Sequence, residues 1–224
     1  SGDPSVMFYN PAGIAFEKGT SAMAEQVLWF ESVSYTAFAV NRRVEKFGAF
    51  GFGLQMLNYC SIDSLNNVGV ADGSFSPKDL VVAAGWGKTL NNNWSAGAQA
   101  KYLSTKITNS ATAFLADLGA QYRRGPLTAG LAIQNFGTKL KFNSESESVP
   151  TQIRLGAAYG WQKVTAYGDI GMPSDAKTWI AAGGEYKLLA DEKFRVALRA
   201  GYSTRAGDAR NDKTFPVSFG LGLG

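Results

Sequence analysis

The sequence predicts an all-β fold in which antiparallel strands form a transmembrane β-barrel. Apolar and polar residues alternate with a period of two along most of the chain, as they do in half-buried strands. Glycine is abundant, with 26 among 224 residues, and 12% of the residues are aromatic. Hydrophobic residues make up 45% of the chain, yet the mean hydropathy is −0.11 and no apolar run approaches the roughly 18 residues of a transmembrane helix.

The alternation is clearest in residues 151–159, where apolar side chains take every second position and Arg154 lies on the other face. Many alternating segments exceed the five or six residues usual in soluble sheets and suit the roughly 9–11 residues of a tilted membrane-spanning strand. We therefore expect one domain over residues 1–224 with roughly eleven or twelve strands. These strands are expected at residues 20–31, 33–43, 46–58, 79–88, 94–102, 113–123, 127–135, 151–159, 163–170, 178–188, 194–202 and 219–223.

Short turns and longer polar connections separate the expected strands. Short turns are predicted at residues 31–32, 91–93, 123–126 and 160–162. Longer loops are predicted at residues 61–77, 105–110, 137–150, 172–177 and 204–214. Short turns alternating with longer loops are typical of a barrel that has one periplasmic and one extracellular rim. Aromatic residues gather toward strand ends, as expected for girdles at the two membrane interfaces.

Four basic residues are predicted to face the lumen of the barrel: Arg154, Lys163, Arg195 and Arg199. Each falls on the polar face of an expected strand, opposite a face that carries no charge in mid-strand. A soluble β-sandwich would show the same alternation, because its polar face is wetted by water, so alternation alone leaves both architectures open. The length of the strands favours the barrel.

The composition limits the chemistry of the chain. It contains no histidine, and Cys60 is its only cysteine, which excludes Ser-His-Asp and Cys-His catalysis and nearly every zinc constellation. No catalytic constellation, metal site or cofactor is expected. The net charge of +4 comes from dispersed residues without a basic stripe, so nucleic acid is not expected as a partner. The chain is therefore predicted not to be an enzyme.

The N-terminal stretch is the most specific motif. Asn10-Pro11-Ala12-Gly13 predicts a stiff, non-helical segment, because Pro11 disfavours the α region for Asn10 and Gly13 permits a tight turn. The run DPSVMFYNPAGIA resembles the N-terminal segment of the FadL-like superfamily of bacterial outer-membrane barrels, and particularly of its PorV/PorQ family. The resemblance implies that residues 1–16 form a hatch inside the barrel lumen.

Further motifs resemble the same family in order along the chain. They are the segments at residues 73–80, 117–123, 125–127, 131–137, 149–159 and 199–202. The resemblance implies a FadL-type barrel of about fourteen strands, of which this chain would supply eleven or twelve. Both ends of the natural protein are accordingly expected to lie outside residues 1–224.

The resemblance implies a bacterial outer-membrane protein with a non-catalytic role. In the PorV-like reading it binds partner and substrate proteins of the type IX secretion system through loops 61–77 and 137–150, with outer-membrane lipid around it. A FadL-like channel for hydrophobic small molecules is the first alternative. A soluble extracellular β-sandwich that acts as a binding module is the second.

Overall fold

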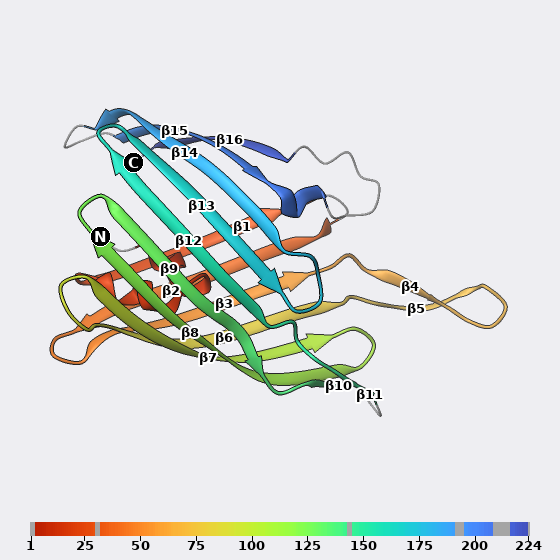
Figure 1. The fold of residues 1–224 in the computed structure, drawn as a ribbon. Helices are drawn as coiled ribbons and strands as arrows, with labels where there is room; N and C mark the ends of the chain where they lie inside the picture. Colours follow the sequence, from red (N-terminus) through yellow and green to blue (C-terminus); the bar gives the residue numbers. More distant parts are fainter. Residues whose placement is uncertain (1–2, 30–31, 143–144, 191–194, 208–215, 224) are drawn as a thin grey trace.

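Twelve antiparallel strands form the main sheet of the computed structural model, which describes residues 3–29, 32–142, 145–190, 195–207 and 216–223 (Figure 1). Strands that are consecutive in the main sheet pair with each other, so the chain runs up and down without a crossover. The strands are β1 (Thr20–Leu28), β2 (Ser34–Val44), β3 (Gly48–Asn58), β6 (Lys78–Thr89), β7 (Trp94–Lys106), β8 (Ser110–Arg124), β9 (Leu127–Gly137), β12 (Gln152–Trp161), β13 (Val164–Pro173), β14 (Trp179–Ala190), β15 (Arg195–Ser203) and β16 (Val217–Leu223).

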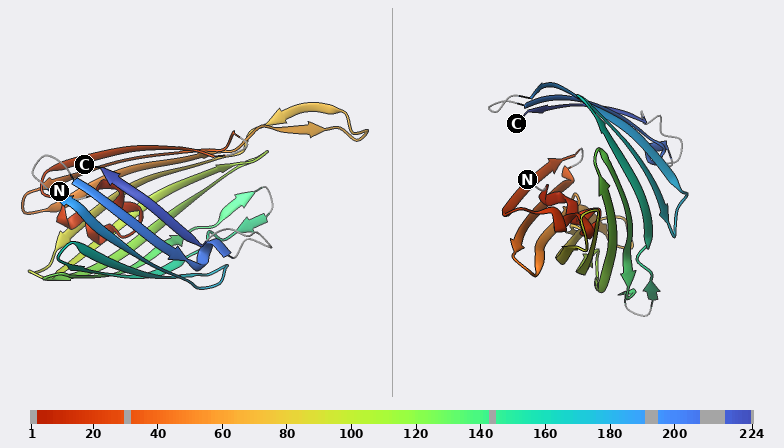
Figure 2. Two further views of the ribbon diagram at one scale, coloured as in Figure 1. Left: turned by 90° about the horizontal axis from the view of Figure 1, so that it is seen from above. Right: turned by 60° about the vertical axis from the view of Figure 1, so that its left-hand side comes forward.

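The sheet curves strongly into an open, C-shaped wall, and its first and last strands border the opening (Figure 2). β1 and β16 stand at the two ends of the strand order and are its edge strands. The prediction of an all-β antiparallel fold is thereby confirmed, and the strand count agrees with the eleven or twelve expected. A closed barrel of FadL type stays a prediction, because the described residues form an open sheet.

Connections of different length gather at the two ends of the strands. Tight turns at residues 45–47, 90–93, 125–126 and 162–163 define the short-turn rim. At the opposite end, the long-loop rim, two predicted loops contain small hairpins of their own (Figure 1). The first is β4 (Ile62–Leu65) with β5 (Ala71–Phe75), and the second is β10 (Leu140–Phe142) with β11 (Glu145–Glu147). A short 3₁₀ helix, η4 (Thr204–Gly207), lies between β15 and β16.

The two faces of the sheet are opposite in polarity to those of a soluble protein. Along β12 the residues alternate without interruption between half-buried and exposed. Apolar residues such as Ile153 and Leu155 are the exposed ones, whereas Arg154 between them is half-buried. Apolar side chains therefore cover the convex outer face, and polar and small side chains line the concave inner face.

The N-terminal segment, residues 3–17, lies on the concave face (Figure 2). It contains two 3₁₀ helices, η1 (Pro4–Phe8) and η2 (Pro11–Phe16), so the expectation of a non-helical segment is wrong. Asn10 is extended, as the following proline requires, and forms the N-cap of η2. Gly13 lies within η2 instead of at a turn, and an added Cβ there would collide with Val6.

The core of the protein is small and is built where this segment meets the sheet. Met7 and Ile14 are fully buried against alanines of β2, β3 and β6. Small inner-face side chains leave space that the N-terminal segment fills, which explains the alanine and glycine content of these strands. Within the described ranges, no helix has the length and apolar content needed to cross a membrane.

Candidate functional site

Strand glycines make room for the N-terminal segment on the inner wall. An added Cβ on Gly97 of β7 would lie within 3 Å of the backbone of Pro11, and one on Gly87 of β6 would lie 2.7 Å from the Ala15 nitrogen. An added Cβ on Gly119 of β8 would collide with the Asn10 side chain. The register places Gly97 directly opposite both Gly87 and Gly119, so the three glycines form one trough across three strands. The backbone of the segment can approach the sheet this closely only because these positions lack a side chain.

Asn10 fixes the segment at its centre. Its Oδ1 accepts a hydrogen bond from the Ala12 N–H at 3.0 Å, which caps η2. Its Nδ2 donates to the carbonyl oxygens of Ala120 on β8 and Leu131 on β9, both at 3.2 Å. One side chain therefore orders the segment and also ties it to two neighbouring strands.

Side chains of the wall donate to carbonyl oxygens of the segment at several further points. The fully buried Ser95 Oγ donates to the Ala12 oxygen at 3.2 Å, and Asn41 Nδ2 donates to the Pro4 oxygen at the same distance. Gln134 Nε2 donates to the Phe8 oxygen at 3.0 Å. Short helices leave carbonyl groups without intrahelical partners, and inner-face side chains satisfy several of them here.

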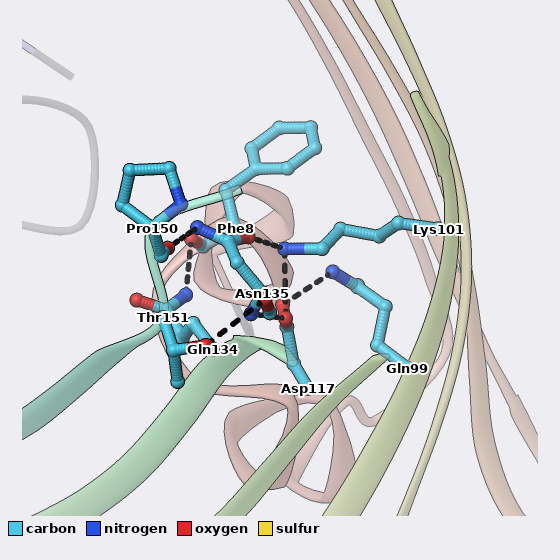
Figure 3. Close-up of polar contacts among 8 residues, drawn as sticks. All are labelled: Phe8, Gln99, Lys101, Asp117, Gln134, Asn135, Pro150 and Thr151. Carbon is cyan, nitrogen blue, oxygen red and sulfur yellow. Dashed lines mark hydrogen bonds and ion pairs between the residues drawn. The ribbon is translucent and has the colours of Figure 1, made fainter. Parts of the chain in front are cut away.

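A buried ion pair lies beside the segment (Figure 3). The carboxylate of Asp117 on β8 is inaccessible to solvent, and its Oδ1 lies 2.7 Å from Lys101 Nζ of β7. Gln99 Nε2 donates to the other carboxylate oxygen at 3.1 Å, and the Asn135 N–H donates to Oδ1 at 2.8 Å. The buried carboxylate is thus paired and hydrogen-bonded, as its desolvation requires.

The ion pair coincides with a β-bulge. The register of β8 and β9 shifts between Ala116 and Leu118, so that Gln134 and Asn135 together lie opposite Asp117. Asn135 takes a left-handed conformation with φ of 61°, which asparagine tolerates better than most residues with a side chain. The Asp117 carboxylate accepts the N–H that the bulge leaves without a ladder partner.

The same bulge reaches the base of a long loop (Figure 3). Asn135 Nδ2 donates to the Pro150 oxygen at 3.3 Å, and Thr151 Oγ1 donates to the Asn135 oxygen at 3.4 Å. Pro150 and Thr151 connect the β10–β11 hairpin to β12. Hydrogen bonds thus run from the N-terminal segment at Phe8, through Gln134 and Asn135, to the foot of this hairpin.

The sequence motifs at residues 117–123 and 131–137 include Asp117, Gln134 and Asn135, but they do not predict this polar cluster. A signal is present in the sequence, since Lys101 and Asp117 are charged residues on the same strand faces as Gly97 and Gly119. A charge in such a place needs a partner on the next strand. The bulge is not predictable from the alternation of residues within one strand, because it is a change in the pairing between β8 and β9.

The four predicted lumen-facing residues have different outcomes. Arg154 lies on the inner face of β12, and Arg199 lies on the inner face of β15, where its Nε donates to Glu185 Oε2 at 2.8 Å. Lys163 lies in the turn between β12 and β13 and is exposed, so its placement on the inner face of a strand is wrong. The side chain of Arg195 lies outside the described residues, although its backbone begins β15.

Arg154 links the N-terminal segment to the second half of the sheet. Its guanidinium lies 5.2 Å from the ring centroid of Tyr9 and 5.3 Å from that of Trp179, and 3.7 Å from Asp169 Oδ1. A cavity of about 210 Å³ lies next to it, lined by Tyr9, Arg154 and Asp169 among others. A larger cavity of about 720 Å³ lies at the long-loop rim beside Trp179 and Arg205.

Neither a protein-family model nor a curated protein matches the sequence. Among the described residues, no group of three or more Cys, Asp or Glu side chains is placed to hold a metal ion. The inner site is an arrangement for holding a polypeptide segment against a wall.

The outer face carries aromatic side chains at two levels. On β7 and β8, Trp94 and Tyr122 are neighbours near the short-turn rim, with ring centroids 5.0 Å apart. Tyr102 and Phe114 form a second pair, 5.4 Å apart, toward the long-loop rim. The pairs are separated by eight residues along each strand, about 26 Å at the usual rise, or about 20 Å along the axis of a tilted strand. Between them the outer face carries alanines and Leu118.

The β4–β5 hairpin, called the arm below, projects from the long-loop rim beyond the sheet (Figure 1). Its strands form a separate two-stranded sheet, and apolar side chains at its end are exposed: Leu65 by 64%, Val68 by 80% and Val70 by 59%. Asn66 Oδ1 accepts the N–H groups of Val68 and Val70, both at 3.0 Å, so the turn is ordered. At its base, Tyr59 Oη donates to Asp79 Oδ2 at 3.3 Å. Burial and the nearby carboxylate raise the pKa of Tyr59, which keeps the phenol protonated.

Proposed function

We propose that this chain is a bacterial outer-membrane β-barrel protein of the PorV/PorQ type, with residues 1–16 as a hatch in the lumen. Its role is non-catalytic: it binds partner and substrate proteins of the type IX secretion system. The observation that carries the proposal is the inverted polarity of the sheet, whose apolar face is exposed and whose polar face is enclosed.

The exposed apolar face favours lipid as its environment. Large apolar side chains are exposed on strand after strand, including Phe114, Leu118, Leu155, Ile180 and Phe219. Soluble monomers rarely expose contiguous apolar surface beyond a few hundred Å². A soluble β-sandwich would pack these side chains in its core, and here the concave side contains the N-terminal segment instead. The sandwich alternative is therefore disfavoured.

The N-terminal segment favours a closed lumen over an open channel. Four wall side chains, Asn41, Arg43, Ser95 and Gln134, donate to its carbonyl oxygens, and the glycine trough brings it into contact with the wall. A plug held at this many points does not leave by simple side-chain motion. The rim cavity of about 720 Å³ is the observation that favours a FadL-like conduit as the second candidate. The lining of this cavity includes the charged residues Asp175, Lys177 and Arg205, and a charged lining suits hydrophobic solutes poorly.

The arm supports a role in binding partner proteins. It presents exposed Leu65, Val68 and Val70 on an ordered turn away from the sheet, and apolar groups so placed bury surface only when a partner covers them. It coincides with one of the two loops, residues 61–77, for which partner binding was expected.

Cell fractionation tests the location. The full-length protein is expected in the outer-membrane fraction, resistant to alkaline carbonate and soluble only in detergent. Recovery of the full-length protein in the aqueous fraction would contradict the membrane assignment, whatever its partners.

Affinity purification from detergent-solubilised outer membrane tests the role. Wild-type protein is expected to co-purify with a large translocon barrel or with secreted proteins that share a C-terminal β-domain. The matched variant Leu65→Ser/Val68→Ser/Val70→Ser keeps Asn66 and its turn and should recover at least about fivefold less partner, in line with about 1 kcal/mol or more for lost apolar contacts. Purification of the wild-type protein without partners, together with lipid-like solutes in the lumen, would favour the conduit.

A further inference from the structure

Basic residues are concentrated at the short-turn rim. The described cations at this end of the strands are Lys18, Arg42, Arg43, Lys46, Lys88, Arg123, Arg124, Lys163 and Lys187. The described acidic residues there are Glu17, Glu45 and Glu185. Glu17 is only 3% exposed, and Glu185 is paired with Arg199. This rim is therefore strongly positive within the part of the chain that the structure describes.

The opposite rim does not share this excess. Cations at the long-loop rim, such as Lys78, Lys106 and Lys141, are matched by acidic residues at the same rim, including Asp63, Asp72, Glu145, Glu147 and Asp175. Among the residues that the structure describes, positive charge is therefore concentrated at one end of the strands, although the net charge of the chain is only +4.

Three of the short-turn cations point outward, on the same face as the apolar band. Arg42 of β2 pairs with Phe50, Lys88 of β6 with Ala96, and Arg124 of β8 with Leu127. Directly opposite residues in an antiparallel pair share a face, so these side chains continue the apolar stripes of their strands. All three are exposed.

Aromatic side chains lie between these cations and the apolar band. Trp86 precedes Lys88 on the outer face of β6, and its Nε1 donates to the Phe47 oxygen at 2.8 Å. Tyr122 likewise precedes Arg124 on the outer face of β8, where it contacts Trp94 of β7. Tryptophan and tyrosine favour the headgroup level of a bilayer, so cations just beyond them meet the lipid phosphates.

We infer that the short-turn rim binds the headgroups of anionic glycerophospholipids through Arg42, Lys88 and Arg124. The inference rests on the proposed membrane location of the outer face. Arginine and lysine form charge-assisted hydrogen bonds with phosphate, and aliphatic stems that lie along apolar surface let their charged ends reach it. Anionic lipids are thereby favoured over zwitterionic ones in the leaflet that contacts this rim.

Fluorescence quenching by brominated lipid tests the inference, because the protein carries its own reporters. Trp86, Trp94 and Trp161 are exposed near the short-turn rim, whereas Trp179 is 8% exposed on the inner face. Trp29 at the other rim is replaced by phenylalanine in every sample. The full chain is reconstituted in zwitterionic vesicles that contain either brominated phosphatidylglycerol or brominated phosphatidylcholine.

The wild-type rim is expected to bind the anionic lipid about fivefold more tightly than the zwitterionic one, equivalent to about 1 kcal/mol near a charged surface. The variant Arg42→Gln/Lys88→Gln/Arg124→Gln should lose this preference, and 0.5 M salt should weaken it in the wild type. The matched control Lys78→Gln/Lys106→Gln neutralises outward lysines at the other rim and should keep it.

Each opposite result has its own meaning. Equal quenching by both lipids in the wild type would overturn the inference, place these cations against an acidic protein instead, and leave the membrane location intact. A preference that survives in the triple variant, or that disappears equally in the control, would overturn the assignment to this rim. Absence of quenching by either lipid would contradict the proposed membrane location itself.

Discussion

At the scale of single residues, Asp117 organises the inner wall. Its buried carboxylate forms an ion pair with Lys101 of β7 and accepts hydrogen bonds from the Gln99 amide of β7 and the Asn135 N–H of β9. A buried pair of this kind adds little net stability over apolar residues of the same size, but removal of one partner leaves an uncompensated charge. The cluster is therefore best understood as a device that fixes the β8–β9 bulge and, through Gln134, the position of Phe8.

The substitution Asp117→Asn tests this role. Asparagine retains an acceptor for the Asn135 N–H but leaves the Lys101 ammonium buried without a counter-charge, so the free energy of unfolding should fall by about 3–5 kcal/mol. The double variant Lys101→Met/Asp117→Asn removes that charge and should recover part of the loss. Denaturant unfolding of the reconstituted protein, followed by far-UV circular dichroism, measures both. A single variant as stable as the wild type would show that the pair is not buried.

At the scale of elements, the sequence predicted the strands better than what lies between them. The twelve strands follow from a period-two pattern that every strand repeats on its own. The polar residues of 61–77 and 137–150 predict loops, whereas the structure forms the arm and the β10–β11 hairpin there, with short strands whose side chains are nearly all exposed. Local alternation carries no signal when neither face is buried.

The N-terminal segment shows the same limit in another form. Its prolines correctly predicted the extended conformation of Asn10, but the two 3₁₀ helices depend on carbonyl partners such as Ser95 and Gln134, which are distant in sequence. The glycine trough is likewise invisible in the sequence, where Gly97 and Gly119 are two glycines among many. Only the strand register brings them together under Pro11.

A matched pair of glycine substitutions tests how the segment is held. In Gly97→Ala the new methyl group would overlap the Pro11 backbone, so the segment should dock less tightly at a cost of about 1–3 kcal/mol. In Gly168→Ala on β13 nothing lies within 4 Å of the added carbon, so stability should stay within about 0.5 kcal/mol of the wild type. Thermal unfolding midpoints and trypsin cleavage after the exposed Lys18 report the difference. Equal behaviour of the two variants would mean that the segment does not contact β7.

At the scale of the whole molecule, the environment of the outer face decides the function. The sequence predicted which residues share a face, but alternation is symmetric and does not tell which face is enclosed. The structure resolves this by placing the N-terminal segment on the side of Ala39, Ala49 and Ala83. Arg154 and Arg199 on the inner face then become neighbours of Asp169 and Glu185, a pairing that the sequence could not supply.

An arginine scan of the outer face distinguishes a lipid environment from water. Leu118 is 49% exposed and lies midway between Phe114 and Tyr122 on β8, whereas Leu127 is 38% exposed at the start of β9 by the short-turn rim. In a bilayer, Leu118→Arg should lower the free energy of unfolding by about 2–4 kcal/mol and Leu127→Arg by about 0–1, because the cost of a charge depends on its depth. Unfolding from lipid vesicles measures both values. If the face were wet, both exposed positions would accept arginine at a similar small cost, since most surface substitutions change stability by less than about 0.5 kcal/mol. A depth-dependent difference is thus the result that only a membrane-embedded sheet produces.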